Sequence, residues 1–306
     1  MSTLFHRIDI SSGHKGPRGL IIAGVHGDEY EPVMAIIKLL KLVPSQLDKG
    51  TLTLVPVVNQ EAFFSMSRTG ADGKDLARTC PGVVLGSPTE NIAFQISSLI
   101  MESDFLVDMH TGGATFEIYP LAGYMLHPEG NILNKQRAMA KAFNLPITWG
   151  TNHELEGRTL SVARDANTPA IYTEYGGGRY NPDTISELVD GCLNILSYFG
   201  MLQKEDHKPS KVKYEVEDHR KSSGHLQIMY PSPIEGIFMS KVKLGNVIHK
   251  GDTLGEVWNL NGEDINEIVA KEDGLVFLLR TVPPVRQGDA LAGILPISQL
   301  GSVIIK

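Results

Sequence analysis

The sequence of 306 residues predicts an α/β fold, with a mixed, mostly parallel β-sheet flanked by helices and a smaller C-terminal β-barrel. Two observations support this prediction. Between about residues 19 and 200, short apolar runs alternate with amphipathic segments of helix length, whereas the later part has short apolar stretches separated by Gly-Asp turns. An uninterrupted apolar run is typical of a strand buried on both faces, as the strands of parallel sheets are.

Four apolar runs are predicted strands: GLIIAGV at 19–25, LTLVPVV at 52–58, FLVDMH at 105–110 and AIYTEYG at 170–176. A helix is predicted over 182–199, because apolar residues recur there at intervals of three and four and because Pro182 and Gly200 mark its ends. A similar stripe predicts a second helix just after the HGDE stretch; it consists of Val33, Ile36, Ile37 and Leu40.

The chain is predicted to divide into an α/β domain at 1–205, a connecting segment at 206–230 and a β-barrel domain at 231–306. The run at 203–224 is charged, has few large aliphatic residues and contains Pro209. This composition suits a connection between domains.

The predicted barrel contains an internal repeat that starts at Gly236 and again at Gly274. Each half reads as short strands joined by Gly-Asp turns, and neither half is able to bury its apolar face alone. The pair resembles the biotinyl/lipoyl-type barrel, in which a modified lysine occupies a hairpin between the repeats. The corresponding hairpin, NLNGED at 259–264, has no lysine. A carrier role is therefore disfavoured, and an accessory or oligomerising role is expected.

Charge and composition exclude several classes of partner. The formal net charge is -7 and no basic run occurs, which argues against nucleic acid and anionic membrane surfaces. No secretory leader and no apolar run of about 20 residues are present, so a cytoplasmic location is expected. Cys80 and Cys192 are too few for a disulfide framework or a cysteine metal site. The expected partner is a small molecule.

Candidate polar residues of a functional site follow three of the predicted strands. His26 and Glu29 come after the first, His110 ends FLVDMH, and Glu174 ends the AIYTE stretch. Two neutral imidazoles and one carboxylate suit a catalytic zinc that keeps its fourth position for water. A lone HxxE pair is common on solvated helix faces, but its combination with DMHTGG and TEYGGG favours a site over a structural role.

The remaining groups of a hydrolytic site are also present. Glu174 is the candidate general base, which takes a proton from water and passes it to a leaving nitrogen. The loop at 65–82 supplies Arg68 and Arg78, whose planar guanidinium groups match a carboxylate or a developing oxyanion.

Taken together, these motifs resemble the succinylglutamate desuccinylase/aspartoacylase family, within the zinc carboxypeptidase-like hydrolases. The resemblance covers roughly residues 18 to 200, and the C-terminal barrel is similar to the subgroup that includes deacetylases of N-acetylated diamino acids. It implies one Zn²⁺ per chain and assigns roles to residues of this sequence. The implied zinc ligands are His26, Glu29 and His110; the general base is Glu174; the oxyanion is stabilised by Arg68; the substrate carboxylate is bound by Arg78 and Arg164; and Asp75 orients the first zinc histidine.

The chain departs from the family pattern at one position. The family's loop motif reads Asp-Leu-Asn-Arg, whereas Asp75 is followed here by Leu76, Ala77 and Arg78. Alanine offers no side-chain hydrogen bond to a substrate carboxylate, so about 1 kcal/mol of binding is in question. The metal chemistry is unaffected.

We therefore expect a zinc-dependent hydrolase that cleaves the amide bond of a small N-acylated amino acid or related amine. One alternative is a metallocarboxypeptidase that acts on peptides. Another is a non-enzymatic protein that uses the C-terminal barrel for docking. A homo-oligomer is possible with any of the three.

Overall fold

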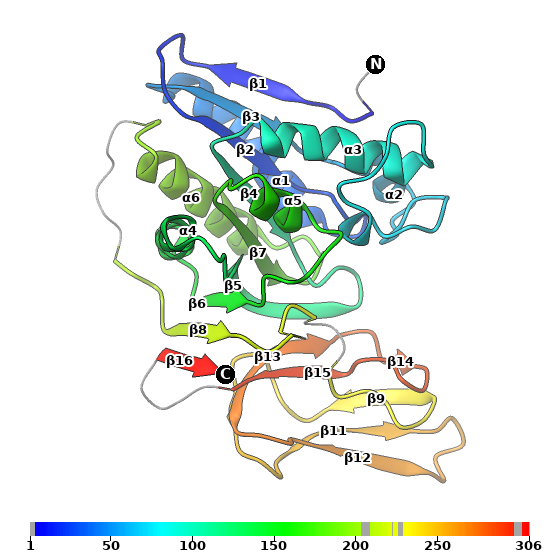
Figure 1. Ribbon diagram of the computed structural model, residues 1–306. Coiled ribbons are helices and arrows are strands. Elements are labelled where there is room, and N and C mark those ends of the chain that lie inside the picture. Colours follow the sequence, from blue (N-terminus) through cyan, green and yellow to red (C-terminus); the bar gives the residue numbers. More distant parts are fainter. Residues whose placement is uncertain (1–3, 203–208, 222, 226–228, 297–301, 306) are drawn as a thin grey trace.

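The computed structural model describes residues 4–202, 209–221, 223–225, 229–296 and 302–305. A central mixed sheet has the strand order β1-β3-β2-β4-β7-β5-β6-β8-β16 (Figure 1). Its strands are β1 Ile8–Ser11, β2 Arg18–Ile22, β3 Thr51–Val55, β4 Phe105–His110, β5 Phe116–Met125, β6 Ile147–Thr151, β7 Ala170–Gly176, β8 Tyr214–Asp218 and β16 Ser302–Ile305.

Helices cover both faces of this sheet (Figure 1). One apolar layer contains residues of α1, α4 and α6, and the layer on the other face contains residues of α3 and α5. The helices are α1 Tyr30–Leu42, α2 Gln60–Phe64, α3 Pro88–Met101, α4 Gly130–Phe143, α5 Thr159–Asp165 and α6 Pro182–Tyr198, with 3-10 turns η1 Val43–Ser45 and η2 Leu76–Arg78.

The α/β prediction is confirmed, and the four predicted strands correspond to β2, β3, β4 and β7. These four strands are parallel to one another, whereas β1 runs antiparallel to β3 at the edge of the sheet. β5 runs antiparallel to β7, and this pair joins two parts of the sheet whose strands run in opposite directions. Both predicted helices are present as α1 and α6. In α1 the buried stripe includes Leu39, whereas Ile37 is 47% exposed.

The N-terminal ends of α3 and α6 are fixed by proline and by side chains that accept hydrogen bonds from backbone N–H groups. The first helical residue of both α3 and α6 is proline, which lacks the N–H that would have no partner there. The side chain of Asn181 accepts a hydrogen bond from the N–H of Asp183 at the start of α6. Glu90 accepts one from the N–H of Ser87 at the start of α3, at 2.7 Å. These contacts satisfy N–H groups that a helix leaves free.

The C-terminal region consists of strands, and its repeat has pseudo-twofold pairing. β9 pairs with β11 and β13 pairs with β15, while each short middle strand crosses over: β10 pairs with β13, and β14 pairs with β9. Hydrogen bonds among the described residues do not close these strands into a barrel. The strands are β9 Gly236–Ser240, β10 Val247–Ile248, β11 Thr253–Trp258, β12 Ile265–Val269, β13 Gly274–Arg280, β14 Pro284–Val285 and β15 Ala292–Leu295.

The predicted connecting segment contains a strand of the central sheet. β8 lies parallel to β6, and its Val216 and Asp218 are buried. The charged residues of β8 alternate with these buried ones, so the composition of the segment resembles that of a linker. One of them, Glu217, accepts hydrogen bonds from Tyr124 and Arg137. β13 also pairs with β5, so the C-terminal region extends the same sheet. The proposed boundaries at 205 and 230 stay a prediction.

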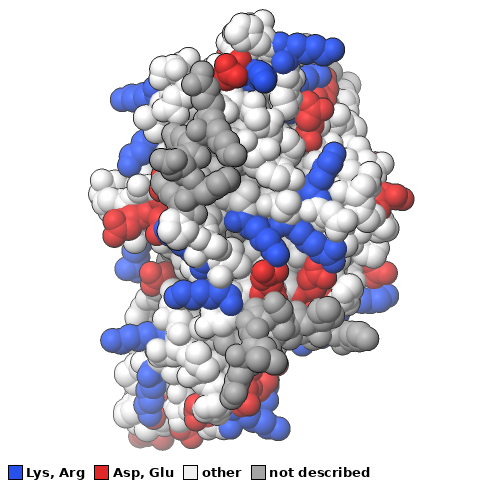
Figure 2. Space-filling view, turned by 90° about the vertical axis from the view of Figure 1, so that its left-hand side faces the viewer, with Lys and Arg blue, Asp and Glu red and all other residues white. Residues whose placement is uncertain are grey.

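The surface carries both signs of charge. Figure 2 shows Lys and Arg side chains next to Asp and Glu over one face of the molecule. Several are paired, such as Lys141 with Glu215 and Lys211 with Glu187, both at 2.8 Å. No helix within the described part of the chain has the length and apolarity that crossing a bilayer requires.

Helices α4 and α6 pack closely because residue 191 has no side chain. A Cβ atom built on Gly191 would lie 2.2 Å from the ring of Phe143. We expect Gly191→Ala to lower the free energy of unfolding by about 1–2 kcal/mol, because overpacking outweighs the gain of roughly 1 kcal/mol in helix propensity. Urea denaturation measures this change.

The matched control is Gly130→Ala in α4, where nothing lies within 4 Å of the added carbon. Its stability should be unchanged or slightly raised. An equally stable Gly191→Ala protein would show that this helix contact has room to spare.

Candidate active site

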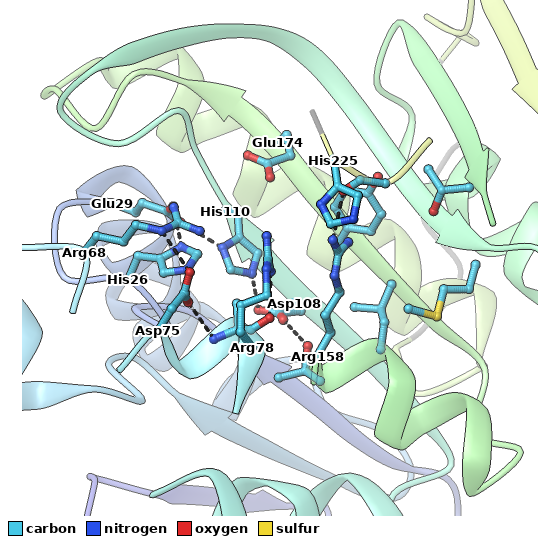
Figure 3. Close-up of a pocket in the computed structure, with 17 residues that line it drawn as sticks. His26, Glu29, Arg68, Asp75, Arg78, Asp108, His110, Arg158, Glu174 and His225 are labelled. Carbon is cyan, nitrogen blue, oxygen red and sulfur yellow. Dashed lines mark hydrogen bonds and ion pairs between the residues drawn. The ribbon is translucent and has the colours of Figure 1, made fainter. Parts of the chain in front are cut away.

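One face of the central sheet carries the polar residues of the site. Side chains alternate between the faces of a strand, so Asp108 and His110 of β4 share a face, as do Tyr172 and Glu174 of β7. His110 lies directly beside Glu174 in the parallel register of these strands. All four residues line a cavity of about 300 Å³, which is the size of small-molecule sites (Figure 3).

His26, Glu29 and His110 converge in this cavity. The carboxylate of Glu29 bridges the two imidazoles: Oε1 lies 2.8 Å from Nδ1 of His26, and Oε2 lies 2.9 Å from Nδ1 of His110. The N–H of Thr111 also donates to Glu29 Oε2. One ligand atom from each of the three residues lies within 4.8 Å of the others, and all three residues are buried.

The backbone around His26 depends on a close approach. A Cβ atom on Gly27 would lie 2.0 Å from the backbone of Ala62, so only glycine fits at this turn. The N–H of Gly27 donates to the carbonyl of Ser67. Glu29 then occupies the N-cap position of α1. This turn brings the side chains of His26 and Glu29 into contact, with Gly27 and Asp28 between them in the chain.

An aspartate contacts the other ring nitrogen of each histidine. Nε2 of His26 lies 3.1 Å from Oδ1 of Asp75, and Nε2 of His110 lies 3.1 Å from Oδ1 of Asp108. Each ring is therefore fixed with its Nδ1 atom facing Glu29 on the inner side of the cluster. Carboxylates in this position also raise the basicity of a metal-ligating imidazole.

The cluster requires positive charge. Burial disfavours the charged forms of His26 and His110. The nearby carboxylates of Glu29, Asp75 and Asp108 outweigh this effect and raise the pKa values of both histidines. The pKa of Glu29 is correspondingly lowered by the two histidines despite its burial. A divalent cation supplies the same charge without protons on the rings, and metal binding to histidine releases such protons. The nitrogen and oxygen donors of this cluster fit Zn²⁺.

Glu174 faces the cluster from the neighbouring strand (Figure 3). Burial, reinforced by the charge of Glu29, raises its pKa to about 8, against the opposing effect of His110, His26 and Arg68. Its Oε2 atom is buried and has no hydrogen-bond partner among the described residues. A carboxyl group with a raised pKa and a free oxygen is suited to accept and release a proton.

Arg68 and Asp75 come from the loop between β3 and α3. Nε of Arg68 donates to Oδ2 of Asp75 at 3.0 Å, while Oδ1 of the same carboxylate accepts from the N–H of Ala77. Asp75 therefore holds both His26 and Arg68, which places the guanidinium next to the His-Glu-His cluster. Ala77 and Arg78 line the cavity beyond it.

The structure does not bring Arg164 to the cavity. Its guanidinium contacts Asp165, Glu156 and the carbonyls of His153 and Leu155, so it braces the loop at 153–156. Arg158 lies in the wall instead. Arg158 is the N-cap residue of α5 and Arg164 lies in its last turn. The sequence carries no signal for which of them lines the cavity, since this depends on how the short helix packs.

Sequence reasoning also missed His225 and Tyr172, which line the cavity. Tyr172 lies two residues before Glu174 on the same strand face, so strand alternation was the signal that could have found it. His225 follows β8 in the segment interpreted as a connection, and no motif marks it.

A family model of the succinylglutamate desuccinylase/aspartoacylase catalytic domain matches residues 15–199. The N-alpha-acetyl-L-2,4-diaminobutyric acid deacetylase of Halomonas elongata is 28% identical over 285 residues, which cover 91% of this chain and 82% of the relative. The product-bound ectoine utilization protein EutE (DoeB) of Ruegeria pomeroyi superposes with a TM-score of 0.87 at 28% identity, covering 95% and 88% of the two chains. A succinylglutamate desuccinylase of Silicibacter sp. TM1040 gives 0.86 at 26% identity, covering 96% and 89%.

Arg164 and Arg158 should respond differently to truncation. Arg164→Ala is expected to lower the free energy of unfolding by about 1–3 kcal/mol, because the carbonyls of His153 and Leu155 lose their donor. Arg158→Ala removes one hydrogen bond, to the carbonyl of Gly224, and should cost less. Urea denaturation of the two variants compares them, and equal losses would contradict a bracing role for Arg164.

Proposed function

The chain belongs to the succinylglutamate desuccinylase/aspartoacylase family, and from this premise we propose that it is a zinc-dependent deacylase of a small N-acylated amino acid or related amine. The observation that carries the proposal is the buried convergence of His26, Glu29 and His110 beside Glu174 in one cavity. The similarity to a deacetylase over 91% of the chain supports the reaction type.

The proposed zinc ligands are His26, Glu29 and His110. When bound there, zinc supplies a Lewis acid that polarises the acyl carbonyl and lowers the pKa of a water molecule to about 7. Asp75 and Asp108 orient the two imidazoles through Nε2.

Glu174 is the proposed general base and acid. It takes a proton from the attacking water as the new C–O bond forms, and it delivers this proton to the amide nitrogen as the C–N bond breaks. A pKa of about 8 would leave much of the group protonated at pH 7. A divalent cation in the adjacent cluster favours the carboxylate form, and thereby prepares the base for its first step.

The arginines bind the substrate in this proposal. Arg68, held by Asp75 at 3.0 Å, stabilises the negative charge that develops on the acyl oxygen. Arg78 and Arg158 bind a carboxylate of the amine part, because both line the cavity and neither has a carboxylate within ion-pair distance among the described residues. Arg158 thus takes the role that the sequence suggested for Arg164.

The size of the cavity favours a small substrate over a peptide. The cavity measures about 300 Å³, and Gly224 and His225 from the segment after β8 form part of its wall. A family match to a catalytic domain also argues against a purely docking protein. A cytoplasmic location and a homo-oligomer remain predictions.

The metal assignment predicts about one zinc per chain in protein purified without chelator. Elemental analysis should give this ratio, and Glu29→Gln and His110→Ala should each lower it well below one because a ligand is lost. Added zinc should raise the unfolding midpoint of the metal-free parent protein by ligand linkage. His249→Ala, at an exposed ring in the C-terminal region, is the control. Full zinc content in both ligand variants would refute the site.

The base assignment predicts that Glu174→Gln lowers kcat by about 10²- to 10⁴-fold, because the side-chain amide of glutamine is unable to take a proton from the attacking water. Zinc content should be unchanged, since Glu174 is not a proposed ligand. Steady-state kinetics on N-acyl amino acids measures the effect, with Glu102→Gln, an exposed carboxylate at the end of α3, as the control. Retention of full activity would remove Glu174 from this role.

A further inference from the structure

Helix α5 reaches the His-Glu-His cluster through one buried hydroxyl group. Oγ1 of Thr159, the first residue of α5, donates to Oδ2 of Asp108 at 2.5 Å. The other oxygen of this carboxylate, Oδ1, lies 3.1 Å from Nε2 of His110, and Figure 3 shows this contact. A series of contacts therefore runs from the helix through Asp108 to a proposed metal ligand.

The side chains of Thr159, Asp108 and His110 are all buried. In such surroundings a hydrogen bond is stronger than in water, and an ionised acceptor strengthens it further. The O–H···O distance of 2.5 Å lies at the short end of the range for carboxylate acceptors, which is about 2.5–2.7 Å. Loss of the hydroxyl would leave a buried, charged oxygen without its donor, which is costly.

Strand β4 alone does not orient the carboxylate of Asp108. Strand pairing fixes the backbone of this residue, but the bond between Cβ and Cγ of an aspartate has a broad torsional preference. The hydroxyl of Thr159 holds Oδ2, and this contact selects the rotation in which Oδ1 faces His110.

The two carboxylates that contact the histidines are held in different ways. Asp75 accepts hydrogen bonds from the N–H of Ala77 and from Nε of Arg68, in addition to contacting its histidine. Apart from its own histidine, Asp108 has one hydrogen-bond donor among the described residues, and this donor is Thr159. The orientation of Asp108 thus depends on a single side chain, whereas that of Asp75 is supported twice.

The start of α5 does not need the hydroxyl of Thr159. The N–H of Arg158 donates to Oγ of Ser161 at 2.7 Å, and this Oγ donates back to the carbonyl of Arg158 at 2.9 Å. The helix end is therefore stabilised by Ser161. The hydroxyl of Thr159 is directed instead to a carboxylate on another element.

The orientation of Asp108 decides which nitrogen of His110 is available to a metal. When Nε2 carries the proton and donates it to a carboxylate, Nδ1 offers its lone pair. Groups that orient a metal-ligating histidine in this way also raise its basicity, and their loss typically weakens metal binding by about 10- to 100-fold. A threonine that holds such a carboxylate in place should therefore affect metal affinity without contacting the metal.

We propose that Thr159 is a positioning residue of the metal site, which holds Asp108 in the orientation that directs Nδ1 of His110 towards the cation. The inference rests on the zinc site of the proposed function and adds a residue of α5 to that site. Thr159 acts through Asp108 and takes no part in the bond-breaking steps.

The test measures the zinc dissociation constant as zinc passes from the loaded protein to a chromophoric chelator at pH 7. Thr159→Val removes the hydroxyl at nearly constant volume and should raise this constant about tenfold or more. Thr159→Ser keeps a hydroxyl on Cβ and should restore most of the affinity. Thr159→Ala should weaken zinc binding at least as much as Thr159→Val, and it replaces the valine variant if that protein does not fold.

The matched control is Thr53→Val in β3. Oγ1 of Thr53 donates to Oδ1 of Asp9 at 2.6 Å, and neither residue lines the cavity. The variant loses a threonine-to-aspartate hydrogen bond of the same kind, so its unfolding midpoint should fall while its zinc dissociation constant equals that of the parent. An equal loss of zinc affinity in Thr53→Val and Thr159→Val would overturn the inference, because a general loss of stability would then explain both.

A double-mutant cycle shows whether Thr159 acts through Asp108. In an Asp108→Ala background, Thr159→Val should change the zinc dissociation constant by less than about twofold, since the carboxylate that it positions is absent. Fully additive effects would overturn the inference.

The same measurement separates the inference from the function on which it rests. An unchanged zinc constant in both Thr159→Val and Thr159→Ala overturns the positioning role and leaves the zinc-dependent deacylase intact. A parent protein that binds no zinc refutes the proposed function, and the inference with it.

Discussion

The bridge that Glu29 makes between His26 and His110 is the constraint on which the rest of the site depends. A buried carboxylate is costly unless charged or hydrogen-bonded partners surround it, and here both oxygens are occupied by imidazole nitrogens. The pairing of β2 with β4 in the sheet makes the bridge possible, because it brings the ends of these strands together. Asp75 and Asp108 then complete a cluster with enough negative charge to favour a cation.

The segments around this cluster hold two arginines in the cavity, one next to the cluster and one held by a different part of the chain. Arg68 is tied to the cluster through Asp75, whereas Arg158 is positioned by the segment after β8. The cavity is therefore assembled from both halves of the mixed sheet, which meet at the antiparallel pair of β7 and β5. The raised pKa of Glu174 follows chiefly from the burial of this carboxyl group in the wall of the cavity.

The C-terminal strands contribute to this arrangement rather than standing apart from it. β13 pairs with the first residues of β5, and the N–H of Thr281 donates to the carbonyl of Thr115. This contact supports the glycine-containing loop that follows His110. The pseudo-twofold repeat is thus joined to the central sheet through β13. The hairpin between β11 and β12 has no lysine that would make it a carrier.

The sequence by itself determined strands β2, β3, β4 and β7 and the residues of the His-Glu-His cluster, because apolar runs and strand-terminal motifs are local properties of the chain. It also indicated Glu174, Arg68 and Arg78 through short motifs. Only the tertiary structure placed Arg158 rather than Arg164 in the wall of the cavity, inserted β8 into the sheet and brought His225 to the cavity. These outcomes depend on how a short helix and a charged strand pack against distant residues, and such packing leaves no periodic trace in the sequence.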